Sequence, residues 1–528
     1  MIKCASVFSD NMVLQREKPV RIFGVCSQGS GITVSVPELS VSARAVVTGE
    51  RWEALLPAMP AMPSCSLVVE SGEETLRFTN VALGEVWIAG GQSNMEFELR
   101  SDKNGAEELA GCSAENVRYY YTPKCEMKDE KLREMEANTG WGLPSEEGSR
   151  AWSAVGYYFA KELSRTLGVT VGILGCNWGG TSASAWMRRD YLERDSRLVP
   201  YLQDYDRAVS GKTDQEMIRE YDDYLVYQAQ WERKMQEIYA QRPDAKWAEV
   251  LKICGENRYP GPMGIKNPMR PCGLYDTMVS RVAPYSARGV LWYQGESDDH
   301  RPGAYYPLFC SMIQCWRDTF RDDELPFMIV QLPMFRYAED PDYKHWCLIR
   351  EAQEKVFRTV RNTGLAPALD CGEFNNIHPI DKSEVGRRLY LQAMSEVYGL
   401  LGNSLTMAPR YSYHTPFGGR IAVFLHNYSP ACTLRAQEGW IGDFELAGAD
   451  GQWYPAEEGR IDGYRIILSS AKVPEPENVR YLWTNYGEVR LFGDNGLPVL
   501  PFRTCTEESS AFFAGTAIRT TDGGASSV

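Results

Sequence analysis

The chain has 528 residues, which is too long for one ordinary domain and predicts three or four. A hydrophobic content of 44% and a charged content of 24% are typical of globular proteins, and no run approaches the ~20 apolar residues of a membrane-spanning helix. Fifty-six basic against seventy acidic residues leave a formal net charge of −14, which argues against nucleic acid as the main partner.

The first part of the chain is predicted to be a β module. Up to about residue 80, short runs of β-branched and apolar residues, as at 20–23, 32–36 and 67–69, are separated by Gly, Pro and Ser turns. This spacing is typical of a sandwich, and we assign it to residues 1–82.

The cysteines and the N-terminal sequence indicate in which cellular compartment the protein is expected. The fourteen cysteines are dispersed and form no CxxC pair, so neither a zinc site nor a redox motif is predicted. The first twenty residues contain no apolar signal-peptide core. We therefore expect buried free thiols and a cytoplasmic protein.

A change of pattern near residue 83 marks an α/β domain. Short β-branched or aromatic runs alternate with helical segments, the best of them at 153–167, where apolar residues hold one face. This alternation predicts an α/β fold with a parallel sheet wrapped by helices over residues 83–400. Residues 190–270 interrupt it with a mostly helical insertion, either an intramolecular lid or buttress or, alternatively, a coiled-coil partner surface.

The C-terminal part returns to short strands after a helix at 383–400. It predicts a second β module over residues 401–517. The last residues, 518–528, are rich in Gly, Ser and Thr and are expected to form a disordered tail. The expected architecture is therefore a central α/β domain flanked by two β-sandwich-like modules.

The strongest local motif is a strand that runs into a double glycine and a serine. Residues 86–89 are followed by Gly90, Gly91, Gln92 and Ser93. This pattern sets a hydroxyl on a sharp turn at the carboxyl edge of a sheet, where open α/β sheets bind ligands. The motif is not the GxSxG elbow, so on local grounds Ser93 is either a nucleophile or part of a structural turn.

The base for such a serine is sought among five histidines. A serine hydroxyl needs an adjacent neutral imidazole to accept its proton. His378 follows the strand predicted at 364–370 and precedes a helix, so it alone lies on a strand-to-helix loop late in the α/β domain. It is the candidate base, the alternative being a loop histidine bonded to backbone. The others lie in a charged run, at a helix start or in the C-terminal β module: His300, His345, His414 and His426.

Two further segments offer donors for an oxyanion, which acyl transfer requires. The glycine pair within 178–181 follows a strand at 169–174, and paired glycines let backbone N–H groups approach a ligand closely. Gln294 follows the strand at 289–293 and can donate through its amide. All these segments stand at the carboxyl ends of predicted parallel strands, so we expect them to meet in one cleft.

Taken together, the motifs GGQSNM, WGGTSASAW, WYQGESD and NIHPIDK, in this order, resemble the SGNH (GDSL-like) hydrolases, specifically the sialate O-acetylesterase family with its carbohydrate acetylesterase relatives. The resemblance covers most of the chain, from VFSDNMVLQREKPVRIFG to GLPVLPFRT. It implies Ser93 as nucleophile and His378 as base. It also implies an oxyanion hole built from the Ser93 and Gly180 N–H groups and the Gln294 side chain, with no metal or organic cofactor.

One departure from the family concerns the group that orients the histidine. Many SGNH enzymes have an aspartate three residues before it, whereas this chain has Asn375. Three replacements stay open: a backbone carbonyl near Asn375, Asp370 at the end of the preceding strand, or Glu296 of the QGE motif. A carboxylate is favoured, because relatives with the QGE motif recruit its glutamate.

The implied activity is carbohydrate O-acetyl ester hydrolysis through an acyl-enzyme, with 9-O-acetylated sialic acid as the substrate. This sugar is anionic and the protein is acidic, so a local cationic pocket must offset the repulsion. Arg188, Arg350 and Lys382 are the candidates, each with a surface or salt-bridge role as the alternative. Acetylated xylan or another oligosaccharide is the second substrate, and a non-catalytic carbohydrate-binding protein is the alternative of another class.

Overall fold

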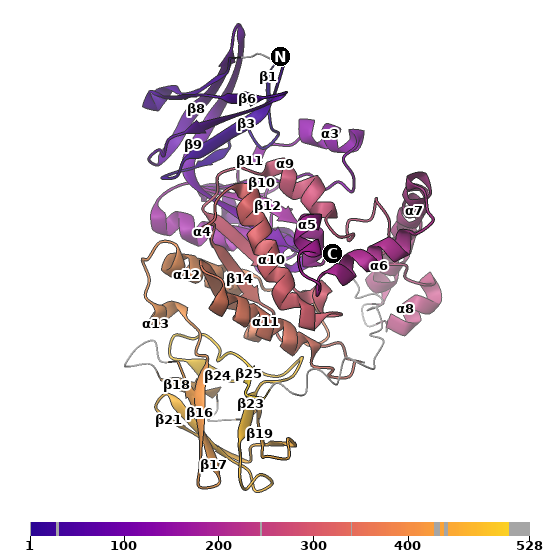
Figure 1. Ribbon diagram of the computed structural model, residues 1–528, viewed down its shortest axis with the longest axis vertical. Helices are drawn as coiled ribbons and strands as arrows, with labels where there is room; N and C mark the ends of the chain where they lie inside the picture. Colours follow the sequence, from indigo (N-terminus) through magenta and orange to yellow (C-terminus); the bar gives the residue numbers. More distant parts are fainter. Residues whose placement is uncertain are drawn as a thin grey trace.

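The computed structural model describes residues 2–27, 31–242, 245, 247–338, 340–426, 433–437 and 442–505. A β module at one end of the long axis and a second one at the other end enclose a central α/β domain (Figure 1). The α/β fold class expected from the sequence is confirmed. The tail predicted over residues 518–528 lies outside the described residues.

The central domain is built on part of an 11-stranded sheet. From β10 to β15 its neighbouring strands all pair in parallel, whereas β11 pairs antiparallel with β10 at the edge. The parallel strands are nearly continuous runs of buried residues, as expected for a sheet covered on both faces. The order along the sheet is β11 (Trp141–Gly142), β10 (Val117–Tyr121), β12 (Val171–Asn177), β9 (Glu74–Gly91), β13 (Gly289–Tyr293), β14 (Phe327–Gln331) and β15 (Thr363–Pro367).

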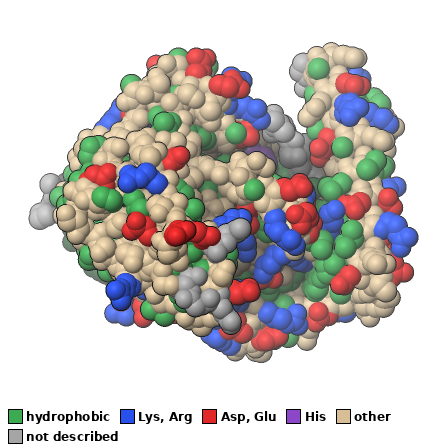
Figure 2. Space-filling model, turned by 90° about the horizontal axis from the view of Figure 1, so that it is seen from above, with side chains coloured by type: hydrophobic (Ala, Val, Ile, Leu, Met, Phe, Trp, Pro, Cys, Tyr) green, Lys and Arg blue, Asp and Glu red, His purple; other side chains and the backbone are tan. Residues whose placement is uncertain are grey.

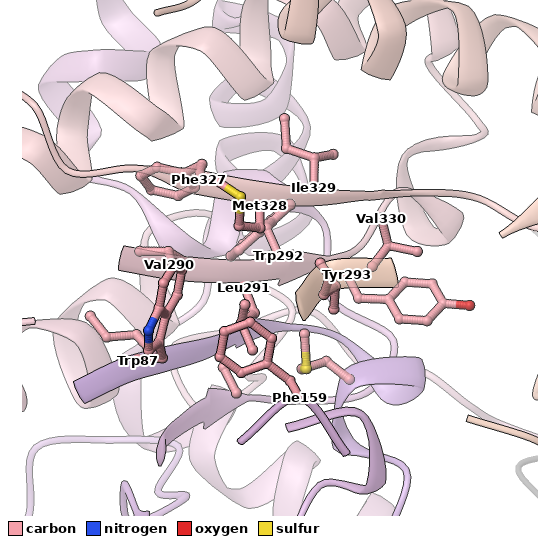
Figure 3. Packing of buried hydrophobic residues seen from close by; sticks show 14 of the residues in the cluster. Trp87, Phe159, Val290, Leu291, Trp292, Tyr293, Phe327, Met328, Ile329 and Val330 are labelled. Carbon is pink, nitrogen blue, oxygen red and sulfur yellow. The ribbon is translucent and has the colours of Figure 1, made fainter. Parts of the chain in front are cut away.

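Helices cover both faces of this sheet, and aromatic rings fill the interface. On one face Trp87 of β9 packs against Phe159, with ring centroids 5.0 Å apart (Figure 3). On the other face Trp292 of β13 packs edge-on against Trp316 at 5.6 Å. Phe159 belongs to α4 (Ala154–Leu167) and Trp316 to α10 (Pro302–Phe320), and they are accompanied by α12 (Ser383–Glu396) and α11 (His345–Thr359).

The N-terminal module is continuous with the central sheet through β9. The first half of β9 pairs antiparallel with β8, and its second half pairs in parallel with β12 and β13. The strand therefore runs without a break through the expected boundary at 82/83. One sheet of the module contains β1 (Ile2–Cys4), β3 (Val20–Cys26), β7 (Arg51–Leu56) and β6 (Val46–Thr48), and β2 (Val13–Gln15), β4 (Thr33–Val36), β5 (Val41–Arg44) and β8 (Met62–Ser71) join the sheet of β9.

The insertion is helical and projects beside the central domain (Figure 1). Its longest helix begins at a capping box, in which Thr213 and Glu216 satisfy each other's backbone N–H groups. A small separate core holds it together, made by Trp231, Met235, Val250 and Cys254. The helices are α5 (Arg189–Glu193), α6 (Val199–Val209), α7 (Asp214–Gln241) and α8 (Trp247–Cys254).

The described part of the C-terminal module consists of short antiparallel sheets. One has the order β16 (Tyr411–Phe417), β17 (Arg420–Leu425), β22 (Arg465–Ser469) and β21 (Glu458–Asp462). A second has the order β20 (Trp453–Pro455), β19 (Phe444–Ala447), β23 (Asn478–Tyr481) and β25 (Phe502–Arg503), and β18 (Leu434–Ala436) pairs with β24 (Leu491–Gly493). The other short α-helices of the described residues are α1 (Ser93–Glu96), α2 (Gly105–Gly111), α3 (Glu130–Ala137), α9 (Ser280–Val282) and α13 (Asn403–Thr406).

Two further features hold for the described residues. Every described cysteine is a free thiol, and most are buried, as the sequence predicts; Cys432 is outside the described ranges. Within the same residues, no helix has the length and apolar character needed to span a membrane.

Candidate active site

The register of three parallel strands sets the site at one edge of the sheet. Gly91 of β9 lies opposite Asn177 of β12 and Tyr293 of β13. The loops that follow these residues therefore leave the sheet at the same level. Gly91 has φ +138°, and a Cβ there would lie 2.1 Å from the Tyr293 carbonyl oxygen, so the turn into Ser93 requires glycine.

Ser93 and His378 meet across this edge. Ser93 is the first residue of α1, and His378 lies in the loop between β15 and α12. The Ser93 Oγ and His378 Nε2 atoms are 2.8 Å apart, which is a hydrogen bond. The ring is thus engaged with the serine, while the His378 backbone N–H donates to the Asn376 side chain at 3.0 Å.

The surroundings of His378 keep its ring neutral. Burial lowers its pKa from the ordinary 6.5 to about 4, and the nearby Lys382 ammonium acts in the same direction. At neutral pH the imidazole is therefore unprotonated and can accept a proton from the Ser93 hydroxyl.

A cavity of about 480 Å³ opens over the serine and the histidine. Its walls come from the loops that follow the parallel strands, from Tyr259 after the insertion helices, and from Asn485 of the C-terminal module. Seen from above, the molecule is hollowed between its main body and the lobe on the right, the side on which α7 and α8 lie in Figure 1 (Figure 2). The cavity is large enough for a sugar-sized ligand.

The backbone N–H groups of Gly180 and of Ser93 itself are available to an oxyanion. In the loop after β12, the Trp178 N–H donates to the Gly91 carbonyl and the Gly179 N–H donates to Glu96 Oε2 at 2.6 Å. Gly180, with φ +72°, follows them, and its N–H has no acceptor within the described part of the chain. The Ser93 N–H, at the first position of α1, has none there either.

Gln294 does not take the place expected for the third donor. Its side chain is fully buried, and its amide nitrogen donates to Asp298 Oδ2 at 2.6 Å and to the Thr181 carbonyl at 3.2 Å. The Tyr305 hydroxyl donates to its amide oxygen at 3.1 Å. Both amide hydrogens are consumed, and Gln294 does not line the cavity. It fastens the loop of Gly180 instead.

The two candidate carboxylates have different environments. Asp370 forms a bidentate ion pair with Arg388, at 2.5 and 2.7 Å, and makes no hydrogen bond with His378. Glu296 lines the cavity, and its Oε1 accepts from Asn94 Nδ2 at 2.7 Å. Its Oε2 is buried without a partner, and burial raises the pKa of this carboxyl. Of these two carboxylates, Glu296 is therefore the one that lies in the cavity with Ser93 and His378.

Asn94 links this carboxylate to the histidine loop. Besides Glu296, its Nδ2 donates to the Ile377 carbonyl at 3.0 Å, directly before His378. Its Oδ1 accepts from Lys382 Nζ at 2.6 Å. Among the described residues, His378 Nδ1 itself has no hydrogen-bond partner. The assignment of Glu296 as the group that orients the His378 ring therefore stays a prediction.

None of the three cations expected to bind substrate lines the cavity. Arg188 pairs with Asp190 at 2.9 Å on a partly exposed surface. Arg350 is fully buried and donates to backbone carbonyls of the C-terminal module. Lys382 is buried behind the site, where it holds Asn94.

The cavity has another cation that the motifs did not indicate. Arg336 lies in the loop after β14 and lines the cavity. Its Nε is buried without a hydrogen bond, and the described residues offer its guanidinium no carboxylate partner. Its position at the carboxyl end of a parallel strand, five residues after Gln331, was the available sequence signal.

Comparisons with known proteins point to carbohydrate esterases. Residues 261–395 match the family model described as carbohydrate esterase, sialic acid-specific acetylesterase. The sialate O-acetylesterases of Mus musculus and Homo sapiens are both 25% identical to this chain, over 91% and 94% of it and over 89% and 91% of their own lengths. The crystal structure of a carbohydrate acetylesterase from Xanthomonas citri superposes with a TM-score of 0.75 at 28% identity, covering 96% of this chain and 100% of its own.

Fold and relatives together indicate a carboxylic ester hydrolase with an SGNH-type fold. Within that class, the resemblance to the sialate O-acetylesterase family that the four motifs carry is confirmed.

Proposed function

We propose that this protein is a sialate O-acetylesterase that removes O-acetyl groups, the 9-O-acetyl group foremost, from sialic acids by a serine–histidine mechanism. The observation that carries the proposal is the 2.8 Å hydrogen bond between Ser93 Oγ and His378 Nε2 at the floor of a sugar-sized cavity. The names of its relatives support the sugar.

The mechanism has two steps. His378 takes the Ser93 proton while Oγ attacks the acetyl carbonyl carbon, and the oxyanion is held by the Gly180 and Ser93 N–H groups. The imidazolium then gives its proton to the sugar oxygen, the C–O bond to the sugar breaks, and an acetyl-enzyme is left. Water, deprotonated by the same imidazole, attacks this ester and releases acetate and the free serine.

Replacement of the serine separates an enzyme from a carbohydrate-binding protein with a dead catalytic domain. Ser93→Ala is expected to lower kcat for p-nitrophenyl acetate about 10³-fold or more, because the nucleophile and its acyl-enzyme are lost. Wild-type protein without hydrolysis, or hydrolysis that survives in Ser93→Ala, would contradict the mechanism.

Arg336 favours an anionic sugar over neutral acetylated xylan. A guanidinium that has no carboxylate partner among the described residues, in a partly buried cavity, is suited to bind a carboxylate in a bidentate manner. A comparison of kcat/KM for 9-O-acetyl sialic acid and for an acetylated xylo-oligosaccharide tests the choice. A higher value for the xylo-oligosaccharide would overturn the sialate assignment and leave the esterase chemistry intact.

The Arg336 side chain itself gives a sharper prediction. Arg336→Gln is expected to raise KM for 9-O-acetyl sialic acid about tenfold or more, the equivalent of one charge-assisted hydrogen bond, with little effect on p-nitrophenyl acetate. Arg100→Gln is the matched control, since Arg100 also lines the cavity but its guanidinium is paired with Glu98 at 2.5 Å. Equal effects of the two substitutions would refute a specific role for Arg336.

A further inference from the structure

The segment after the insertion helices brings a tyrosine hydroxyl to the backbone of Gly180. Tyr259 lines the cavity with Ser93, Gly180 and His378. A Cβ built on Gly180 would lie 1.8 Å from Tyr259 Oη, so this oxygen occupies the space directly beside the Gly180 Cα. Among the described residues the hydroxyl has no hydrogen-bond partner, and its donor is free.

The segment that carries Tyr259 is held in place by buried contacts. Asn267, which is fully buried, donates through Nδ2 to the carbonyls of Pro260 and Pro262 at 3.1 and 3.2 Å. Gly261 lies against the Tyr224 ring of α7, where a Cβ would approach within 2.6 Å. The position of the Tyr259 hydroxyl is therefore fixed before substrate binds.

The side chain expected to complete the oxyanion hole, Gln294, cannot donate to an oxyanion. Both amide hydrogens of Gln294 are donated to Asp298 and to the Thr181 carbonyl. The backbone N–H groups of Ser93 and Gly180 therefore remain as the donors to the oxyanion. Gly180 and Tyr259 line the same cavity as Ser93, so an oxyanion bound there by the Gly180 N–H has the Tyr259 hydroxyl as a neighbour.

We propose that Tyr259 is a catalytic residue whose hydroxyl donates a hydrogen bond to the oxyanion of the tetrahedral intermediate, in the place expected for Gln294. This assignment rests on the proposed serine-esterase mechanism but not on the identity of the sugar. Burial also raises the pKa of Tyr259 above its ordinary value, so the hydroxyl keeps its proton throughout the working pH range.

Tyr259→Phe tests the proposal, because it removes one oxygen that has no hydrogen-bond partner among the described residues. We expect kcat to fall about 30-fold or more for p-nitrophenyl acetate and for an acetylated sugar alike, within reach of the 10²–10³ measured for one oxyanion donor elsewhere. KM and the pH dependence of kcat/KM are expected to stay the same, because neither ground-state binding nor His378 is altered.

Tyr221→Phe is the matched control, a buried tyrosine of α7 in the same insertion that does not line the cavity. Its kinetics are expected to equal those of the wild type, and thermal unfolding of both variants should coincide with that of the parent protein. A Tyr259→Phe enzyme with unchanged kcat on p-nitrophenyl acetate would overturn the proposal. So would a loss confined to KM of the sugar ester, which would make Tyr259 a sugar contact.

The Ser93 and Tyr259 variants give distinguishable outcomes. If the wild type shows no hydrolysis that depends on Ser93, the proposed function falls. If that hydrolysis is present and Tyr259→Phe leaves it intact, only the assignment of Tyr259 is lost.

Discussion

Burial and a neighbouring ammonium group act together on His378, and their effect is visible in the pH dependence of the reaction. The general base must be neutral, so activity rises as the pH passes upward through the pKa of His378, which is lowered to about 4. A profile of kcat/KM for p-nitrophenyl acetate should show its acid limb near pH 4, well below 6.5. An acid limb at 6.5 or above would contradict this environment.

Lys382→Met tests the cause of that shift. Without the positive charge the acid limb should move to higher pH, yet stay below 6.5, because burial is the larger cause. Lys103→Met is the control, since Lys103 is exposed and pairs with Asp381 at the surface.

The two carboxylates considered for His378 should behave differently when neutralised. Glu296→Gln is expected to lower kcat more than about tenfold, because it changes the one carboxylate in the cavity that is tied to the histidine loop through Asn94. Asp370→Asn should leave kcat within about twofold and lower Tm instead, because it breaks the ion pair with the buried Arg388. If both variants keep kcat within tenfold of the wild type, a serine–histidine dyad stands.

At the scale of elements, the contact between α4 and α12 is close because of one glycine. A Cβ on Gly386 of α12 would lie 2.5 Å from the Tyr158 Cβ and 3.1 Å from the Phe159 backbone nitrogen. Gly386→Ala should therefore lower the stability by about 1–3 kcal/mol, seen as a lower Tm in calorimetry.

Gly303→Ala is the control for that substitution. Gly303 is also helical, in α10, but has nothing within 4 Å of its Cβ position. Here alanine should be neutral or stabilising by up to about 1 kcal/mol, because only helix propensity changes. Equal destabilisation at both glycines would show that packing of α12 on α4 is not the cause.

The elements of the site could be predicted from the sequence because they depend on local pattern and on parallel register. Each motif follows a short apolar strand, and the pairing of Gly91 with Asn177 and Tyr293 brings them to one edge. The fate of polar side chains could not be predicted in this way. The Gln294 amide is captured by Asp298, and the sequence does not tell whether an amide four residues from a carboxylate faces it or the ligand.

Long-range contacts explain the remaining differences. Arg350 looked like a substrate ligand, but its partner carbonyl belongs to Thr484, 134 residues further along the chain. Arg336 carries no motif, and only the cavity reveals that its guanidinium lacks a carboxylate among the described residues.

At the scale of the whole molecule, Arg350 fastens the C-terminal module to the catalytic domain. Its guanidinium donates to the carbonyls of Thr484 and Asn485, and the Asn485 side chain in turn accepts from the Trp346 N–H and lines the cavity. The C-terminal module is therefore one wall of the active site.

Arg350→Ala should lower the stability by about 3 kcal/mol or more, because it leaves these buried carbonyls unpaired and opens a void. Calorimetry measures the loss of Tm, and kcat/KM for the sugar ester should fall with it. Arg358→Ala, at an exposed position of the same helix, should change stability by less than about 0.5 kcal/mol. An intact Tm in Arg350→Ala would argue against this anchoring role.

The continuity of β9 also sets an order of events while the chain is being synthesised. Its first half can pair with β8 as soon as both strands leave the ribosome, because the two are neighbours in the sequence. Its second half, which leads to Ser93, must wait for β12 and then for β13, which begins only at Gly289. During that interval the second half of β9 exposes an apolar, unpaired strand edge. Such an edge can pair with strands of other chains and so promote aggregation. The strand that delivers the nucleophile therefore keeps an unpaired edge until the chain has been synthesised as far as Tyr293.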